Sequence, residues 1–197
     1  MKVQFKPRKM NLRNYEFKAR AIDLNNLEQK LLELNPVFKG EDHQIDTYFN
    51  VPTGRLKLRE GNIENALIYY ERPDIADAKQ SDIILYTHQP GSSLKDIMTR
   101  VNGIKTVVDK RRKIYFIGNV KFHFDTVNEL GTFIEVEAID ETGLIGMEKL
   151  EEQCRYYSKY FGLTVSDYIN RSYSDLILEK MNKQNTQILN KASHMKK

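Results

Sequence analysis

The sequence predicts an α+β domain in which eight antiparallel strands close into a barrel with helices packed on the outside. The first observation is that segments with alternating apolar and polar side chains recur between residues 12 and 141, separated by turn residues. The second is their number, about eight, which is enough to close a barrel. The third is a set of segments with helical spacing, which supply a cover for the apolar face of the sheet.

The strands are expected where the alternation is clearest. In residues 12–21, the side chains of Asn14, Glu16, Lys18 and Arg20 share one face. Pairs such as Gly118-Asn119 are typical of the turns between strands. We expect strands at Leu12–Ala21, His43–Asn50, Arg55–Gly61, Ala66–Arg72, Asp82–Gln89, Ile104–Ile117, Val120–Asn128 and Thr132–Asp140.

Four helices are expected from the spacing of apolar residues and from their end signals. The second helix should bury one stripe, made by Leu94, Ile97, Met98 and Val101. The tail, 182–197, is polar and lacks such a stripe, so we expect it to be frayed. No segment rich in Gly or Pro divides the chain, and residues 1–181 are interpreted as a single domain. The helices are expected from Leu24 to Leu34, from Ser92 or Ser93 to Gly103, at Met147–Phe161, and from Ser166 to about Met181.

Length and composition exclude several classes of protein. The 197 residues contain one cysteine, which excludes an internal disulfide framework and favours a reducing compartment. No stretch approaches the roughly 20 apolar residues of a membrane helix, and residues 1–10 lack the apolar run of a secretory signal. We therefore expect a cytoplasmic protein without a membrane partner.

The distribution of charge argues against nucleic acid as a partner. The formal net charge is +4, but residues 1–20 carry +6 and residues 179–197 carry +4, which leaves −6 on the rest of the chain. The most basic run, Lys110-Arg111-Arg112-Lys113, lies within an expected strand and is therefore divided between its two faces. Nucleic-acid binding is not favoured, whereas a homodimer remains open.

The polar face of the expected sheet is densely ionic. Basic residues alternate with leucine in Arg55-Leu56-Lys57-Leu58-Arg59, and acids alternate with aliphatic residues in Ile134-Glu135-Val136-Glu137-Ala138. A solvated outer face would explain any one of these strands. The small number of Ser, Thr and Gln residues across several strands instead favours an enclosed, ionic inner wall.

An inner wall of this kind suits a polyphosphate with its metal. Guanidinium and ammonium groups bind phosphate oxygens through charge-assisted hydrogen bonds. Carboxylates bind Mg²⁺ or Mn²⁺, which also bind phosphate oxygens. Glu135 and Glu137 lie on one face roughly 7 Å apart, so two side chains could hold a metal ion between them.

These residues resemble the CYTH domain, or triphosphate tunnel, family, in particular its class IV adenylate cyclase-like branch. Asn14-Tyr15-Glu16-Phe17-Lys18 matches the second Glu and the Lys of the family's Glu-x-Glu-x-Lys motif. The other matching segments are 43–50, Gly54-Arg55-Leu56-Lys57-Leu58-Arg59, Lys110-Arg111-Arg112, Asp125, and 130–137, in the family's order. The resemblance covers roughly residues 11–165.

The resemblance implies a tunnel that binds a triphosphate such as ATP, thiamine triphosphate or tripolyphosphate, together with Mg²⁺ or Mn²⁺. It implies phosphate binding by Lys18, Lys57, Arg59, Lys110 and Arg112, and metal binding by Glu16, Glu135 and Glu137. A cyclase would convert ATP to cyclic AMP and pyrophosphate, whereas a triphosphatase would direct water at the terminal phosphorus. Both reactions use almost the same charged lining.

Two departures from the family pattern keep a third alternative open, a non-catalytic module that binds polyphosphate. Asn14 replaces the first Glu of the motif, and Glu71-Arg72-Pro73 stands where the family often has a lysine. His123 shares a face with Asp125, which makes it a candidate base, although a single His on a strand is more often only hydrogen-bonded. The second-line site candidates are Asn14, Arg20, Arg55, Glu71, His123 and Asp125.

Overall fold

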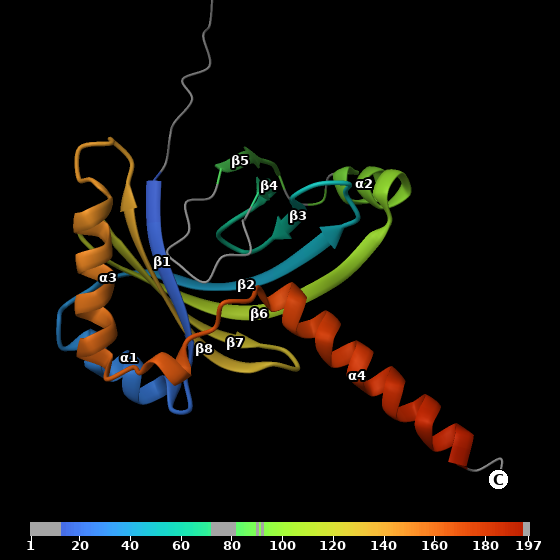
Figure 1. Ribbon diagram of the computed structural model, residues 1–197. Coiled ribbons are helices and arrows are strands. Elements are labelled where there is room, and N and C mark those ends of the chain that lie inside the picture. Colours follow the sequence, from blue (N-terminus) through green and yellow to red (C-terminus); the bar gives the residue numbers. More distant parts are fainter. Residues whose placement is uncertain (1–12, 72–81, 90, 92, 195–197) are drawn as a thin grey trace, which may run out of the picture.

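The structure, a computed structural model of the chain, describes residues 13–71, 82–89, 91 and 93–194. These residues form one curled antiparallel sheet with helices around it (Figure 1). The strands are β1 (Arg13–Arg20), β2 (Val37–Phe49), β3 (Arg55–Glu60), β4 (Ala66–Glu71), β5 (Asp82–Thr87), β6 (Ile104–Ile117), β7 (Val120–Val127) and β8 (Gly131–Asp140). The helices are α1 (Leu24–Leu32), α2 (Leu94–Asn102), α3 (Met147–Phe161), the 3₁₀ helix η1 (Val165–Asp167) and α4 (Tyr173–His194).

The eight strands follow the order β1-β8-β7-β6-β2-β3-β4-β5, and the sheet that they form is strongly curled (Figure 1). The two longest, β2 and β6, form the middle of the sheet. Register shifts between them at Phe38/Gly40 and Tyr48/Phe49 allow a stronger bend than a regular ladder. The α+β class and the eight antiparallel strands are therefore confirmed.

The expected closure into a barrel is wrong. Strands β1 and β5 are the two edges, and no ladder joins them in the described part of the chain. Closure requires the hydrogen-bond register to stagger around the whole sheet. Strands β3, β4 and β5 have only six residues each, and the second edge of β5 pairs with no other described strand. The sheet is thus an open, curled half-barrel.

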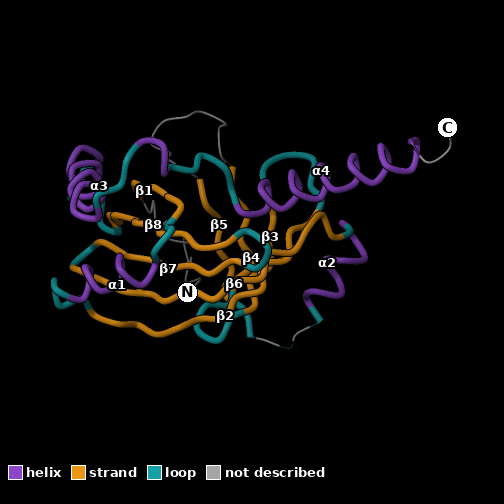
Figure 2. The backbone as a smooth tube through the Cα atoms, turned by 90° about the horizontal axis from the view of Figure 1, so that it is seen from below, coloured by secondary structure: helices purple, strands orange, loops and turns teal. Residues whose placement is uncertain are grey.

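Helices α1 and α3 cover the outer face of β1, β8 and β7, as Figure 2 shows from below. Their apolar stripes bury Leu31 and Leu150 against Phe122 and Val136. Cys154 lies in this core, and burial raises the pKa of its thiol to about 12, so the thiol stays protonated at neutral pH. Because α1 and α3 cover the outer face of these strands, their inner face is the one that can line a cavity.

Helix α4 begins seven residues later than expected and continues beyond the expected end. Its first turn is closed by a reciprocal pair: the Ser172 hydroxyl accepts from the Asp175 N–H (3.2 Å), and the Asp175 carboxylate accepts from the Ser172 N–H (3.3 Å). The helix then leads away from the sheet to His194, so most of the tail expected to be frayed is helical. None of the described helices has the length and apolar character needed to cross a bilayer.

Two further expectations need correction. Strand β2 starts at Val37 and not at His43, because its first half pairs with the distal part of β6. Helix α2 does not face inward: Ile97 is 53% exposed and Val101 74% exposed. Helix α2 packs against β2, and its Lys95 forms an ion pair with Glu60 at the end of β3 (2.7 Å), but these contacts leave Ile97 and Val101 exposed while Leu94 and Met98 are half-buried. Leu12, Arg72, Pro73 and Ser92 lie outside the described residues.

Candidate functional site

The inner faces of the strands line a cavity of about 630 Å³. Strand β8 shows how the sequence builds it: Ile134, Val136 and Ala138 point to the helices, while Glu135 and Glu137 point to the cavity. Its lining contains Asn14, Glu16, Lys18, Asp46, Tyr48, Lys57, Arg59, Glu64, Ile68, Tyr70, Leu85, Lys110, Arg112, Lys121, His123, Glu135, Glu137 and Tyr173. The five predicted phosphate-binding residues and the three predicted metal-binding carboxylates are thus all brought together.

Asp46, on β2, binds three of the predicted phosphate ligands at once. Its carboxylate accepts from the Nζ atoms of Lys57 (3.0 Å) and Lys110 (2.9 Å) and from Nε and Nη2 of Arg59 (2.8 and 2.9 Å). Burial alone would raise the pKa of Asp46, but the charges of Lys110, Lys57 and Arg59 outweigh burial and hold it well below its usual value. Asp46 is therefore a carboxylate at normal pH.

Arg112, on β6, is held by a second buried group. Its Nε and Nη2 atoms donate to Asp125 of β7 (2.6 and 2.5 Å), and Nη2 also donates to Glu135 of β8 (2.8 Å). The Tyr173 hydroxyl, from the first turn of α4, donates to Asp125 as well (2.7 Å). Burial disfavours the guanidinium charge, but Asp125 and Glu135 together raise the pKa of Arg112 well above its usual value. The Arg112 fork is therefore fixed in the cavity wall.

The turn between β3 and β4 supplies another carboxylate. Glu64 accepts from Arg59 Nη1 and from Lys121 Nζ, each at 2.8 Å. Buried Asp42 holds this turn, because its carboxylate accepts from the backbone N–H groups of Ile63 (2.9 Å) and Glu64 (3.0 Å). A Cβ atom at Gly61 would lie 2.7 Å from the Asp42 carboxylate, so the close approach of this turn requires glycine.

The acidic side of the cavity lies where β1 pairs with β8. Glu16 is opposite Glu137 and Lys18 is opposite Glu135. The Asn14 side-chain amide donates to Glu137 (2.7 Å), while Lys18 Nζ lies 3.6 Å from Glu135. Burial raises the pKa of Glu137, and the Glu135 charge adds to this effect, against the opposing influence of Lys121 and Asn14. Glu137 is thus a carboxylate whose charge the surrounding protein does not fully compensate.

This acidic side fits a hard divalent cation. Among the described residues, no group of three or more His, Cys, Asp or Glu side chains is arranged to hold a metal. Mg²⁺, however, is commonly bound by one or two carboxylates together with substrate phosphates. The cross-strand pair Glu16 and Glu137 offers such carboxylates, and the raised pKa of Glu137 shows that a cation there would relieve an unfavourable charge. Glu135 differs, because Arg112 and Lys18 already face its two oxygens.

His123 lies in the same wall and is almost completely buried. Neither ring nitrogen makes a hydrogen bond in the structure, and Nδ1 is 3.5 Å from Glu135. Burial and the charge of Arg112 lower the pKa of His123 to about 4, so the imidazole is neutral at physiological pH. Of the second-line candidates, Asn14 and His123 line the cavity directly, and Asp125 lies behind Arg112.

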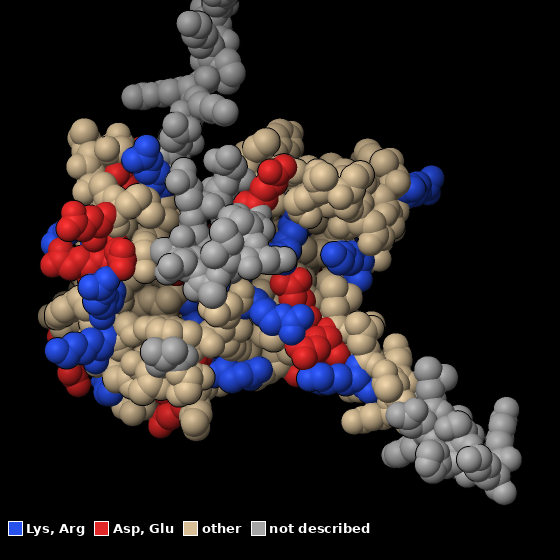
Figure 3. Space-filling model, in the orientation of Figure 1, with Lys and Arg blue, Asp and Glu red and all other residues tan. Residues whose placement is uncertain are grey.

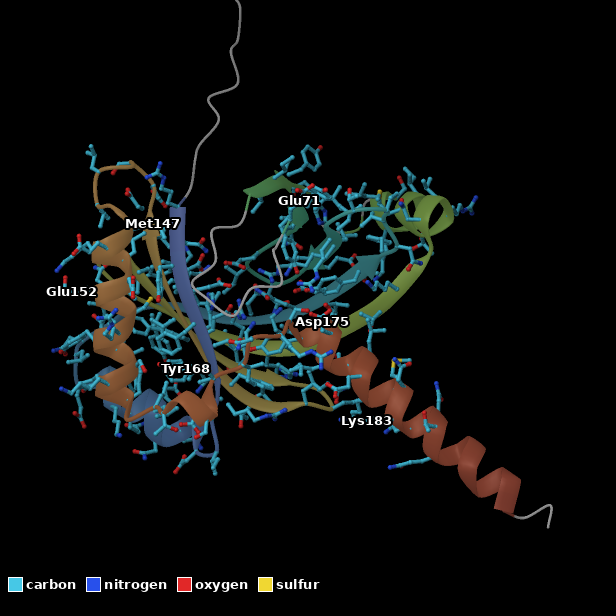
Figure 4. The ribbon with its side chains drawn as sticks, in the orientation of Figure 1. Glu71, Met147, Glu152, Tyr168, Asp175 and Lys183 are labelled. Carbon is cyan, nitrogen blue, oxygen red and sulfur yellow. The ribbon has the colours of Figure 1, made fainter. Side chains whose placement is uncertain are left out.

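The other three second-line candidates lie outside the cavity. Arg20 donates to the Leu130 carbonyl (3.0 Å), and Arg55 forms an ion pair with Asp175 (2.8 Å) at the start of α4. Glu71 is exposed at the end of β4 and accepts from the Tyr69 hydroxyl (Figure 4). On the face seen in Figure 3, basic and acidic side chains are intermixed, and no uniform basic field of the kind nucleic acid requires is visible there.

Several cavity residues were missed by the sequence analysis. In the second strand, Asp46 and Tyr48 are two and four residues after Gln44, so the side chains of all three point to the same face. Alternation along the strand could therefore have placed Asp46 and Tyr48 on the inner face. Lys121 is two residues before His123 on the same strand, so its side chain likewise points to the inner face. Glu64 lies within the turn between β3 and β4, where alternation carries no information, and Tyr173 is the first residue of a helix that was predicted to begin at Ser166.

The Arg112–Asp125 pair generates a stability prediction. Asp125→Asn should lower the free energy of unfolding by about 3–5 kcal/mol, because it removes the main counter-charge of a buried guanidinium. Urea denaturation at neutral pH measures this loss. The control is Glu152→Gln, which breaks an exposed ion pair with Lys149 on α3 and should leave the midpoint unchanged. Equal midpoints for the two variants would contradict the structural importance of Asp125.

Comparisons with known proteins agree with this architecture. The chain is 27% identical over 169 residues to adenylate cyclase CyaB of Aeromonas hydrophila, which covers 82% of this chain and 86% of that protein. The PH1012 protein of Pyrococcus horikoshii superimposes with a TM-score of 0.72 at 25% identity, covering 83% of this chain and 98% of its own. HpAC1 of Hippeastrum, for which a dominant triphosphatase activity is described, superimposes with a TM-score of 0.59 at 11% identity, covering 87% and 96%.

The family model of the CYTH domain matches residues 12–173, which include every strand of the sheet and every residue that lines the charged cavity. This family comprises proteins that act on triphosphates with divalent metal ions. The chain belongs to the CYTH domain family.

Proposed function

We propose that this protein is a metal-dependent enzyme of the class IV adenylate cyclase type, which converts ATP to cyclic AMP and pyrophosphate. The observation that carries the proposal is that one cavity brings the five predicted phosphate-binding side chains together with an acidic cross-strand pair. Its volume, about 630 Å³, lies within the usual range for sites that enclose a small ligand. The likeness to CyaB of Aeromonas hydrophila supports the same reaction.

The basic residues would bind and orient the triphosphate. Lys18 approaches from β1, Lys57 and Arg59 from β3, and Lys110 and Arg112 from β6, so the phosphates would be contacted from both walls of the half-barrel. Because the carboxylates behind these cations already fix their positions, little reorganisation is needed when charge develops on the phosphate oxygens. Their contribution to the reaction is mainly electrostatic.

The carboxylates Glu16 and Glu137 would hold the metal ion, Mg²⁺ or Mn²⁺. When bound, the ion would withdraw charge from the phosphate oxygens. Glu135, which was also predicted as a ligand, faces Arg112 and Lys18 and would orient these two cations. Asn14 would keep the Glu137 carboxylate in place through its amide N–H.

An uncharged part of the cavity favours an organic triphosphate over inorganic tripolyphosphate. Ile68 and Tyr70 of β4 and Leu85 of β5 line the wall next to the basic cluster. A planar base can pack against such side chains, whereas inorganic tripolyphosphate has no group that would use them. This wall distinguishes ATP from a bare polyphosphate, but a triphosphatase with an organic substrate would use it equally.

Turnover assays separate these reactions. The purified protein is incubated with ATP, thiamine triphosphate or tripolyphosphate in the presence of Mg²⁺ or Mn²⁺, and the products are identified. We expect cyclic AMP and pyrophosphate in equal amounts from ATP. Release of free phosphate instead would identify a triphosphatase. Absence of turnover, together with a melting temperature raised by tripolyphosphate, would leave only a polyphosphate-binding module.

Removal of one proposed metal ligand should abolish activity without unfolding the protein. In Glu137→Gln the side-chain carbonyl still accepts from Asn14, but the carboxylate charge is lost. Metal-dependent turnover should fall about 100-fold or more. The control is Glu151→Gln on the outer surface of α3, which should retain full activity. Unchanged turnover in Glu137→Gln would remove this residue from the site.

Asn14→Asp tests the metal site without any measurement of turnover. The substitution brings a second carboxylate close to Glu137, where the amide now donates at 2.7 Å. Repulsion between the two acids should lower the melting temperature in the absence of metal, and Mn²⁺ should raise it more than in the wild type. Asn25→Asp, at an exposed position of α1, is the matched control. An equal Mn²⁺ effect in all three proteins would contradict the proposed position of the metal.

A further inference from the structure

Asp46 is an acid at the centre of the cluster that we propose binds phosphate. A carboxylate there would, by its charge alone, oppose the binding of an anion. Yet it is 1% exposed and makes its hydrogen bonds with Lys57, Arg59 and Lys110, all of them proposed phosphate ligands. We infer that Asp46 is a positioning residue whose carboxylate holds these three side chains in the arrangement that receives the phosphate oxygens; the inference rests on the proposed triphosphate site.

The sheet order explains how one carboxylate reaches all three cations. Strand β2, which carries Asp46, lies between β6 and β3. Lys110 approaches from one neighbour, and Lys57 and Arg59 approach from the other. Since the two Nζ atoms are both within 3.0 Å of the same carboxylate oxygen, they are no more than about 6 Å apart. This spacing would place both ammonium groups within reach of one polyphosphate chain.

The hydrogen bonds to Asp46 leave donors for a ligand. Each ammonium group has three N–H donors, and Lys57 and Lys110 each give one of them to Asp46. Arg59 has five donors, of which two bind Asp46 and one binds Glu64. The carboxylate therefore fixes the position of the cations without using up their capacity to bind phosphate.

The charge of Asp46 also keeps Lys110 protonated. The charged groups that face Lys110 are Asp46 of β2, Lys57 and Arg59 of β3, and Arg112 of its own strand. Burial and the three cations lower the pKa of Lys110, Asp46 opposes them, and the net result is a pKa of about 7. Without the carboxylate, Lys110 would lose its proton at a lower pH, and a neutral amine binds phosphate weakly.

Calorimetric titration with tripolyphosphate tests the inference. At pH 7, Asp46→Asn should bind about tenfold more weakly than the wild type, although the substitution removes a negative charge from an anion site. The matched control is Asp109→Asn, on the outer face of β6, which should bind like the wild type. Equal or tighter binding by Asp46→Asn would overturn the inference. Failure of the wild type to bind would instead overturn the proposed function on which it rests.

The pH dependence separates this role from a merely structural one. Lys110 is charged below its pKa, and the substitution lowers that pKa, so the defect of Asp46→Asn should be smallest at about pH 5.5, where only the loss of positioning contributes to it. It should grow as the pH rises and become constant above the wild-type Lys110 pKa of about 7. In a Lys110→Arg background the guanidinium stays charged, and the defect should no longer vary with pH. If the defect of Asp46→Asn does not vary with pH in the protein that retains Lys110, the protonation role is overturned.

Thermal melting shows whether Asp46→Asn folds. If it does not, Asp46→Glu provides the test, because it retains the charge but displaces it by one methylene group. We expect weaker tripolyphosphate binding at every pH, since the cations would no longer be held in the same positions. Wild-type affinity in Asp46→Glu would show that charge alone suffices and would overturn the positioning role.

Discussion

The inner face of this sheet depends on one physical constraint: a buried cation must have a carboxylate from a neighbouring strand. Arg112 is the clearest case, since Asp125 of β7 and Glu135 of β8 both accept from it. Removing one member of such a group leaves the other buried and uncompensated, which costs far more than the pair contributes. The register of β6, β7 and β8 is therefore tied to the ionic residues of the cavity as well as to the apolar core beneath the helices.

The same constraint prepares the cavity for an anion. Lysine and arginine side chains lose several rotatable bonds when they are fixed, and a ligand that had to fix them would bind less tightly. Here Asp46 and Glu64 have already fixed Lys57 and Arg59 before any ligand arrives. The repulsion between these lysine and arginine side chains is overcome when the protein folds, so it does not reduce the free energy of ligand binding a second time.

Alternation of side chains predicted the parts of the site that lie on regular strands. The alternation of charged and apolar residues correctly placed four side chains on the inner face: Glu135, Glu137, Lys57 and Arg59. Glu64 was beyond this reasoning, because its position depends on a turn held by the distant Asp42. The open sheet could not be predicted either, since closure depends on the stagger of all strands together and no single segment encodes it.

The helices show a similar division between local and tertiary information. The third helix was predicted well, because its apolar stripe and Gly162, with a positive φ of 72°, are both local signals. The stripe of α2 has the same local form, yet Val101 is 74% exposed because the contacts of this helix with β2 and β3 lie elsewhere on its surface. Periodicity therefore indicates which face of a helix is apolar, but not whether the fold supplies a surface to cover it.

Four acidic residues of the cavity divide into two groups, and this division supports the roles that we propose for them. Asp46, Glu64 and Glu135 are each opposed by lysine or arginine, and the pKa of each is lowered as a result. The pKa of Glu137 is raised, although Asn14 donates to it and Lys121 lies nearby. Carboxylates of the first group hold protein cations in position. The charge of Glu137 is less fully compensated, and we propose that a divalent cation arriving with the triphosphate supplies the further positive charge.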